Sequence, residues 1–133
     1  MTRWIMGVVS AALALVLALA PLSGAAARPV RAVAADNATG FAFEPAVKRI
    51  KKGASVKWVN TTGQAHTLVF YKRPAKIKKF TLNPEGSGGD SKSRRFPKKG
   101  TYKYFCTQQG HAIKDGDSCT GGMCGKVRVR APG

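Results

Sequence analysis

The chain has 133 residues, a length that favours a single domain, and its formal net charge is +17. The 23 lysine and arginine residues stand against six acidic residues, so anionic partners are favoured, but charge carries no information about the fold. With two histidines in all, the chain has too few imidazoles to be an oxidase that holds a trinuclear copper cluster.

The first residues have the pattern of an export signal. Arg3 is followed by an uncharged apolar run from Ile5 to Ala20, and small residues up to Ala27 come next. A charged start, an apolar middle and an A-x-A end are typical of a secretory signal peptide, and the run is shorter than the roughly 20 residues of a membrane span. We therefore expect residues 1–27 to be a signal peptide, with a retained membrane anchor as the alternative. The remaining protein would be secreted, cell-surface or periplasmic, where nucleic acid is not an expected partner.

Two regions follow the signal. Residues 28–40 are rich in alanine and short of large apolar residues, which predicts a flexible N-terminal tail. Residues 41–131 form the expected domain, because runs of β-branched and aromatic residues alternate there with turn residues. We expect strands at 41–43, 47–51, 55–60, 66–71, 80–82, 93–96, 101–106 and 126–130. About seven to eight short strands indicate an all-β protein, a Greek-key β-sandwich or barrel.

The segment 72–99 is strongly basic. It holds ten lysine or arginine residues against Glu85 and Asp90, with glycines 86, 88 and 89 at a flexible tip. This segment is either a contact surface for an anionic partner or a solvated face.

Both histidines stand where a shared metal site would need them. His66 begins a predicted strand, Cys106 ends another strand 40 residues later, and His111 follows Cys106 by five residues. Met123 precedes the last strand. Two imidazoles, a thiolate and a distant thioether are the ligand set of a type 1, or blue, copper site, in which sulfur suits Cu(I) and imidazole suits both valences. The pattern therefore predicts one copper ion.

Several stretches of the chain resemble the cupredoxin family, which includes plastocyanin, azurin and halocyanin. They are Phe41-x-Phe-x-Pro45, Gly53-x-Ser-Val-x-Trp-Val-Asn60, Gly100-x-Tyr-x-Tyr-Phe-Cys106 and Gly122-Met-x-Gly-x-Val127. The resemblance implies a Greek-key β-fold, one type 1 copper ion and electron transfer rather than enzymatic catalysis. It also implies that His66, Cys106, His111 and Met123 bind the metal.

The chain departs from the family pattern near Met123. Eleven residues separate it from His111, more than family members usually have. The axial bond of a type 1 site is long and weak, so Gln108, Gln109 or a backbone oxygen could replace a displaced Met123.

The same insertion bears on the other two cysteines. If Cys106 holds copper, Cys119 and Cys124 are left to pair, which resolves the odd number of cysteines. Such a disulfide would fix the long loop beside Met123.

The sequence leaves three functions open. The first is an electron carrier that is not an enzyme, because its ligand set leaves no position for a substrate. The second is a copper scavenger or chaperone that uses the same ligands. The third is a structural zinc site of the Cys2His2 type, built from His66, His111, Cys119 and Cys124. For the carrier we expect a monomer that meets an acidic redox partner protein or an anionic membrane or cell-wall surface.

Overall fold

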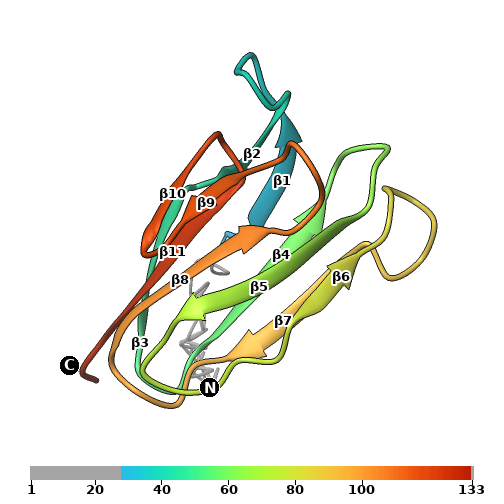
Figure 1. Ribbon diagram of the computed structural model, residues 1–133. Coiled ribbons are helices and arrows are strands. Elements are labelled where there is room, and N and C mark those ends of the chain that lie inside the picture. Colours follow the sequence, from blue (N-terminus) through green and yellow to red (C-terminus); the bar gives the residue numbers. More distant parts are fainter. Residues whose placement is uncertain (1–27, 133) are drawn as a thin grey trace, which may run out of the picture.

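The computed structural model describes residues 28–132, so the expected signal peptide, residues 1–27, lies outside the described residues. The described chain forms eleven strands (Figure 1). They are β1 (Val30–Ala34), β2 (Phe41–Glu44), β3 (Val47–Lys51), β4 (Ser55–Asn60), β5 (His66–Lys72), β6 (Phe80–Leu82), β7 (Ser91–Arg95), β8 (Gly100–Cys106), β9 (Ile113–Asp115), β10 (Ser118–Thr120) and β11 (Cys124–Arg130). Within residues 28–132 no helix is long and apolar enough to cross a membrane.

The strands form two facing sheets and a separate hairpin. One sheet has the order β2-β1-β4-β7 and the other the order β3-β11-β8-β5-β6, while β9 and β10 pair only with each other. Most neighbours are antiparallel, but β1 runs parallel to β4 and β11 runs parallel to β3. The expectation of an all-β fold is confirmed.

The core lies between the two sheets because inward-facing positions alternate with outward ones along each strand. On β8 the buried residues are Tyr102, Tyr104 and Cys106. Trp58 of β4 crosses the gap and meets the rings of Phe70 and Tyr104 edge-on, at centroid distances of 5.9 and 5.6 Å. These aromatic contacts pack β4 of one sheet against β5 and β8 of the other.

The predicted flexible tail at residues 28–40 is wrong for its central part. Val30–Ala34 forms β1, which lies between β2 and β4, and the side chains of Val30 and Ala32 are fully buried. Large apolar residues are not needed there, because the backbone of β1 pairs with both β2 and β4 while Val30 and Ala32 face the core. The described domain therefore includes Val30 and does not begin at residue 41.

The structure also has more strands than the seven to eight expected. One of the additional strands is β1, and two more, β9 and β10, form a hairpin inside the insertion between His111 and Met123. Their side chains are exposed or only partly buried, so the alternation that marks a core strand does not occur in them.

The two ends of the sandwich differ in the residues they present. The histidine end consists of the segments 34–41, 60–66, 82–91, 106–113 and 121–123, which are joined by backbone bonds such as Asn60 to Asp90 and Met123 to His111. The basic end consists of the segments 51–55, 73–77, 95–100 and 130–132, joined by bonds such as Lys52 to Arg130. Strand β5 connects the ends, since it starts at His66 and finishes at Lys72.

Candidate metal centre

Three side chains converge at the histidine end. The Sγ atom of Cys106 lies 3.7 Å from Nδ1 of His66 and 3.5 Å from Nδ1 of His111, and the two Nδ1 atoms are 3.1 Å apart. All three residues are buried, with exposed fractions of 1%, 0% and 8% for Cys106, His66 and His111. The three residues that the sequence predicted are therefore brought together.

Neighbouring strands of one sheet place two of these residues. His66 is the first residue of β5 and Cys106 the last residue of β8, and the antiparallel pairing sets Leu68 opposite Cys106. The backbone amide of Thr107 donates to the carbonyl of Thr67 at 2.8 Å, which continues the ladder one step past Cys106. The turn after Cys106 then returns His111, whose amide donates to the carbonyl of Gln108 at 3.1 Å.

A chain of hydrogen bonds fixes the orientation of the His66 ring. The Asn60 amide nitrogen donates to the carbonyls of Gln64 and Asn83, so its oxygen faces Thr62. The Thr62 hydroxyl donates to that oxygen at 2.8 Å and lies 2.8 Å from Nε2 of His66. Since the only hydroxyl proton is used toward Asn60, Nε2 of His66 must be the donor to Thr62. This tautomer leaves an unprotonated Nδ1 facing Cys106.

Burial sets the charges at the centre. Desolvation, and then the proximity of His111, lowers the pKa of His66 to about 4, and desolvation also lowers the pKa of His111. Both rings are thus neutral at pH 7 and offer lone pairs. Burial raises the pKa of the Cys106 thiol, although the backbone amides of Gln108 and Thr67 oppose this by hydrogen bonding to the sulfur. A cation between the three atoms would stabilise the thiolate.

Phe41 covers the two imidazoles. Its ring centroid lies 5.1 Å from that of His66 and 4.6 Å from that of His111. Phe41 is partly exposed and packs on the metal centre as well as on the core. Asn60, Thr62 and this role of Phe41 were not found from the sequence. An asparagine and a threonine just before a histidine that starts a strand are the available signal.

Met123 lies directly against the other candidate ligands through its backbone. Its amide donates to the carbonyl of His111 at 3.2 Å, and its carbonyl accepts from the amide of Cys106 at 3.1 Å. Its side chain is fully buried, whereas Gln108 and Gln109 are exposed. Burial therefore favours the Met123 thioether over either glutamine as the fourth ligand.

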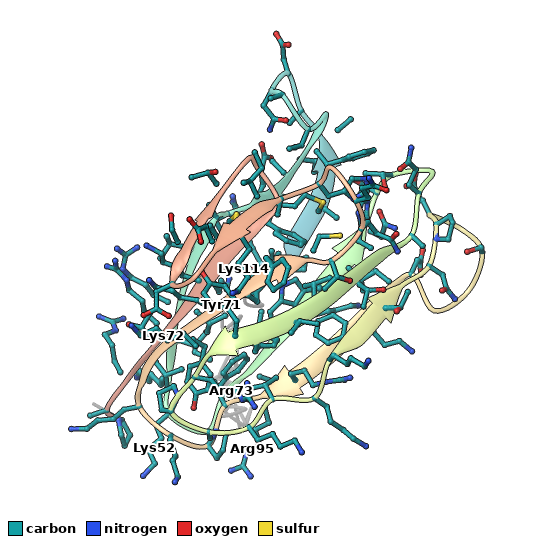
Figure 2. The ribbon with its side chains drawn as sticks, viewed as in Figure 1. Lys52, Tyr71, Lys72, Arg73, Arg95 and Lys114 are labelled. Atoms are coloured by element: carbon teal, nitrogen blue, oxygen red, sulfur yellow. A yellow bond between two sulfur atoms is a disulfide. The ribbon has the colours of Figure 1, made fainter. Side chains whose placement is uncertain are left out.

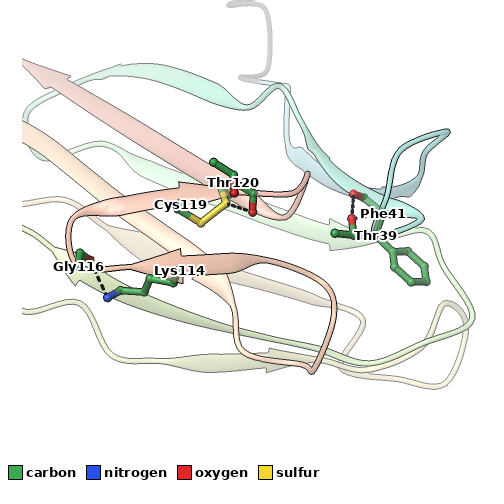
Figure 3. Close-up of a disulfide and its surroundings, with 7 residues drawn as sticks. Thr39, Phe41, Lys114, Gly116, Cys119 and Thr120 are labelled. Atoms are coloured by element: carbon green, nitrogen blue, oxygen red, sulfur yellow. Dashed lines mark hydrogen bonds between the residues drawn. A yellow bond between two sulfur atoms is a disulfide. The ribbon is translucent and has the colours of Figure 1, made fainter.

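Cys119 and Cys124 form a disulfide, with an S–S distance of 1.99 Å (Figure 3). The bond joins β10 to the first residue of β11 and so ties the hairpin to the strand that follows Met123. Neither sulfur can act as a thiolate while it is in a disulfide. The zinc site built on His66, His111 and both of these cysteines is therefore wrong for this structure.

The donor set fits one soft or borderline cation. Two neutral nitrogens and a sulfur lie within 4.8 Å of one another with no cationic side chain among them. Three lone pairs that face one another repel unless a positive ion or a proton lies between them. Thiolate and imidazole together suit copper, and a nearby thioether favours Cu(I) further.

Comparison with known proteins covers the same part of the chain. Residues 30–130 match the family described as copper-binding proteins of the plastocyanin/azurin family. Amicyanin-alpha of Methylorubrum extorquens is 31% identical over 102 residues, which cover 74% of this chain and 85% of that protein. The chloroplastic plastocyanin of Tetradesmus obliquus is 36% identical over 93 residues, or 66% of this chain; the match spans only 58% of the length of that relative.

A solved structure agrees in fold. A purple cupredoxin from Nitrosopumilus maritimus superposes with a TM-score of 0.53 at 19% identity, covering 75% of this chain and 98% of that one. Together with the family match, the arrangement of His66, Cys106, His111 and Met123 is typical of a single type 1 copper ion.

Proposed function

Because the chain belongs to the plastocyanin/azurin family of copper-binding proteins, we propose that it is an exported single-electron carrier and not an enzyme. The observation that carries the proposal is the convergence of Cys106 Sγ with one nitrogen each of His66 and His111 in a buried centre. Bound copper would supply the exchange of one electron between Cu(I) and Cu(II). Export is supported by the signal pattern of residues 1–27.

We assign the metal ligands as His66, Cys106 and His111, with Met123 as the axial ligand. Strands β5 and β8 hold two of them, and the hydrogen bond from His66 to Thr62 fixes one ring before any metal arrives. A site held in one shape needs little rearrangement when its charge changes by one. A buried site with four protein ligands also leaves no position for a substrate, which supports a carrier rather than an enzyme.

Electrons would enter and leave through the histidine end. His111 is the most exposed of the four ligands, at 8%, whereas the others are at 0 or 1%. Its surroundings include the partly buried, apolar Phe41 and Ala112. A small contact centred on this ring, below about 1,200 Å² of buried surface, suits a partner that must dissociate after each transfer.

The distribution of charge bears on the partner. The five segments of the histidine end contain no lysine or arginine, and they carry Asp36, Glu85 and Asp90. An acidic redox partner that bound the cationic residues would therefore lie away from the proposed copper ligands. We therefore favour contact of the basic residues with an anionic surface over an acidic partner docked beside the copper.

The test combines an optical spectrum with reversible voltammetry of the copper-loaded protein. We expect an intense absorption near 600 nm that disappears in Cys106→Ala and persists in the Cys119→Ser/Cys124→Ser double variant, which changes as many sulfurs outside the centre. An electron carrier cycles without losing copper. Release of copper to a chelator on each reduction would instead indicate a scavenger or chaperone, and a colourless copper protein would refute the ligand assignment.

A further inference from the structure

The cationic residues are concentrated at the end of the sandwich opposite the ligands. Eight exposed lysine and arginine residues and no acidic residue lie in the four segments of the basic end: Lys51, Lys52, Arg73, Lys76, Arg95, Lys98, Lys99 and Arg130. Figure 2 shows Lys52 and Arg95 together at this end. From His66 to Lys72 along β5 there are six steps, which span roughly 20 Å at about 3.3 Å per residue.

These cations have almost no internal partners. The one salt bridge among residues 28–132 joins Lys72 to Asp117 at 3.2 Å, and neither residue belongs to the basic end. Arg73 and Arg95 instead donate to backbone carbonyls, those of Phe70 and Gly53. Eight cations close together repel one another, and contact with an anionic surface would relieve that repulsion.

We propose that the basic end binds a membrane surface that contains anionic phospholipids, with the histidine end facing away from the bilayer. The purpose of this orientation rests on the proposed electron-carrier function, since a carrier held in this way would leave its ligands free to meet a redox partner. The binding itself depends only on the eight basic side chains.

The shape of the cationic surface favours a bilayer over a linear polymer. The eight side chains come from three connections between strands and from the end of β11, and these segments belong to both sheets, so the charges spread over an area, as a layer of headgroups does. Of the large apolar residues in the described chain, only Ile113 is exposed, and it lies at the histidine end. The basic end thus offers neither an aromatic platform for stacked bases nor an apolar wedge, and its attraction to lipid is electrostatic.

The direction of the chain agrees with this orientation. Strand β4 begins at Ser55 in the basic end, and β1 runs parallel to it with Val30 opposite Trp58. The polypeptide therefore enters β1 from the direction of the basic end. The described chain thus enters the sheet from the side of the domain that we propose faces the membrane.

Sedimentation with vesicles tests the proposal. The exported, copper-loaded protein should bind vesicles of phosphatidylcholine with phosphatidylglycerol and not vesicles of phosphatidylcholine alone. Each basic residue near an anionic surface contributes about 1 kcal/mol, which is about fivefold in the partition coefficient. The quadruple variant K51Q/K52Q/K98Q/K99Q should therefore lose roughly two orders of magnitude or more in binding.

A second quadruple variant serves as the matched control. K57Q/K78Q/K79Q/K92Q removes the same number of charges from exposed lysines outside the basic end, and we expect it to retain most of the binding. An equal loss in both variants would show that only net charge matters. Absence of binding to phosphatidylglycerol vesicles, or binding only to a soluble anionic polymer such as polyphosphate, would overturn the membrane proposal.

Two further readouts separate this proposal from the electron-carrier function. In the absence of vesicles both quadruple variants should keep the absorption near 600 nm and the rate of reduction by a soluble donor. Vesicle-bound protein should be reduced by that donor as fast as free protein, and strong slowing would refute the orientation. If the metal assignment fails, Cys106→Ala should still bind vesicles through its unchanged basic end.

Discussion

Replacing Thr62 by valine would test how the His66 ring is held. Valine keeps the shape of threonine but removes the hydroxyl that lies 2.8 Å from both Nε2 of His66 and Oδ1 of Asn60. The Asn60 oxygen keeps one partner, the Thr62 amide at 2.9 Å. The buried Nε2–H of His66 would be left without an acceptor, so most of the lost hydrogen-bond energy falls on the His66 ring.

The structure sets the size of the expected effect. A buried donor without an acceptor costs about 1–3 kcal/mol, and we expect Thr62→Val to lower the free energy of unfolding of the metal-free protein by that amount. An unpaired Nε2–H also frees the ring to rotate or to change tautomer, which turns Nδ1 away from Cys106. Loss of a partner that orients a metal ligand typically lowers metal affinity about 10–100-fold.

Urea unfolding of the metal-free protein and competition with a copper chelator measure the two effects. Thr62→Ser keeps the hydroxyl, so its copper affinity should be close to that of the unchanged protein. Only the packing around the lost methyl group should change slightly. If Thr62→Val binds copper as tightly as the unchanged protein, the hydrogen bond does not orient the ring. If Thr62→Ser is as weak as Thr62→Val, the methyl group and not the hydroxyl is responsible.

Further predictions concern pH, the disulfide and one glycine. The pKa of His66 is about 4 in the folded protein against 6.5 in an exposed imidazole, so the unfolded state takes up a proton first as the pH falls. The free energy of unfolding of the metal-free protein should therefore be highest above pH 6.5 and should fall by up to about 3 kcal/mol toward pH 4, as measured by urea unfolding. Stability that does not change over this range would contradict the burial argument. The Cys119→Ser/Cys124→Ser variant should lose about 2 kcal/mol or less, because the disulfide closes a short loop, and calorimetry showing a much larger loss would mean that the hairpin supports the core. At Gly125, a Cβ atom would run into the ring and hydroxyl of the buried Tyr104, so Gly125→Ala should cost about 1–3 kcal/mol in chemical unfolding, and a neutral result would show that Tyr104 can move.

The residues of the metal centre were largely predictable because histidine and unpaired cysteine are rare in this chain. The chain has only two histidines, and the one cysteine outside the disulfide lies five residues before the second of them. His66 could be predicted to lie near this pair only because it begins a strand. The antiparallel pairing of β5 with β8 brings His66 to the same end of the sheet as Cys106. The disulfide could be predicted because the chain has three cysteines, and assigning Cys106 to copper leaves Cys119 and Cys124 to pair.

Other features depend on packing that residue types do not report. β1 contains only alanine, valine and one arginine, so its sequence lacks the aromatic residues that mark core strands such as β4, β5 and β8, and its place between β2 and β4 is set by the fold. The hydrogen bonds of Asn60 and Thr62 depend on the path of the 60–66 loop, which brings Asn60 against Gln64 and Asn83. The β9–β10 hairpin is largely exposed, and neither hydrophobic period nor turn length distinguishes it from an irregular insertion.

Gly122 sits between the first and last parts of the described chain. Its φ of 91° is left-handed, and a side chain there would collide with the carbonyl of Phe41 and the side chains of Asn37 and Thr39. The residue just before Met123 is thus seated against the connection from β1 to β2. The first hundred residues contain β5 and its neighbour β6 but only one of the four proposed ligands, His66, because β8, His111 and Met123 come later in the chain. We therefore expect copper to bind after synthesis, once residues 121–123 have packed against the connection from β1 to β2.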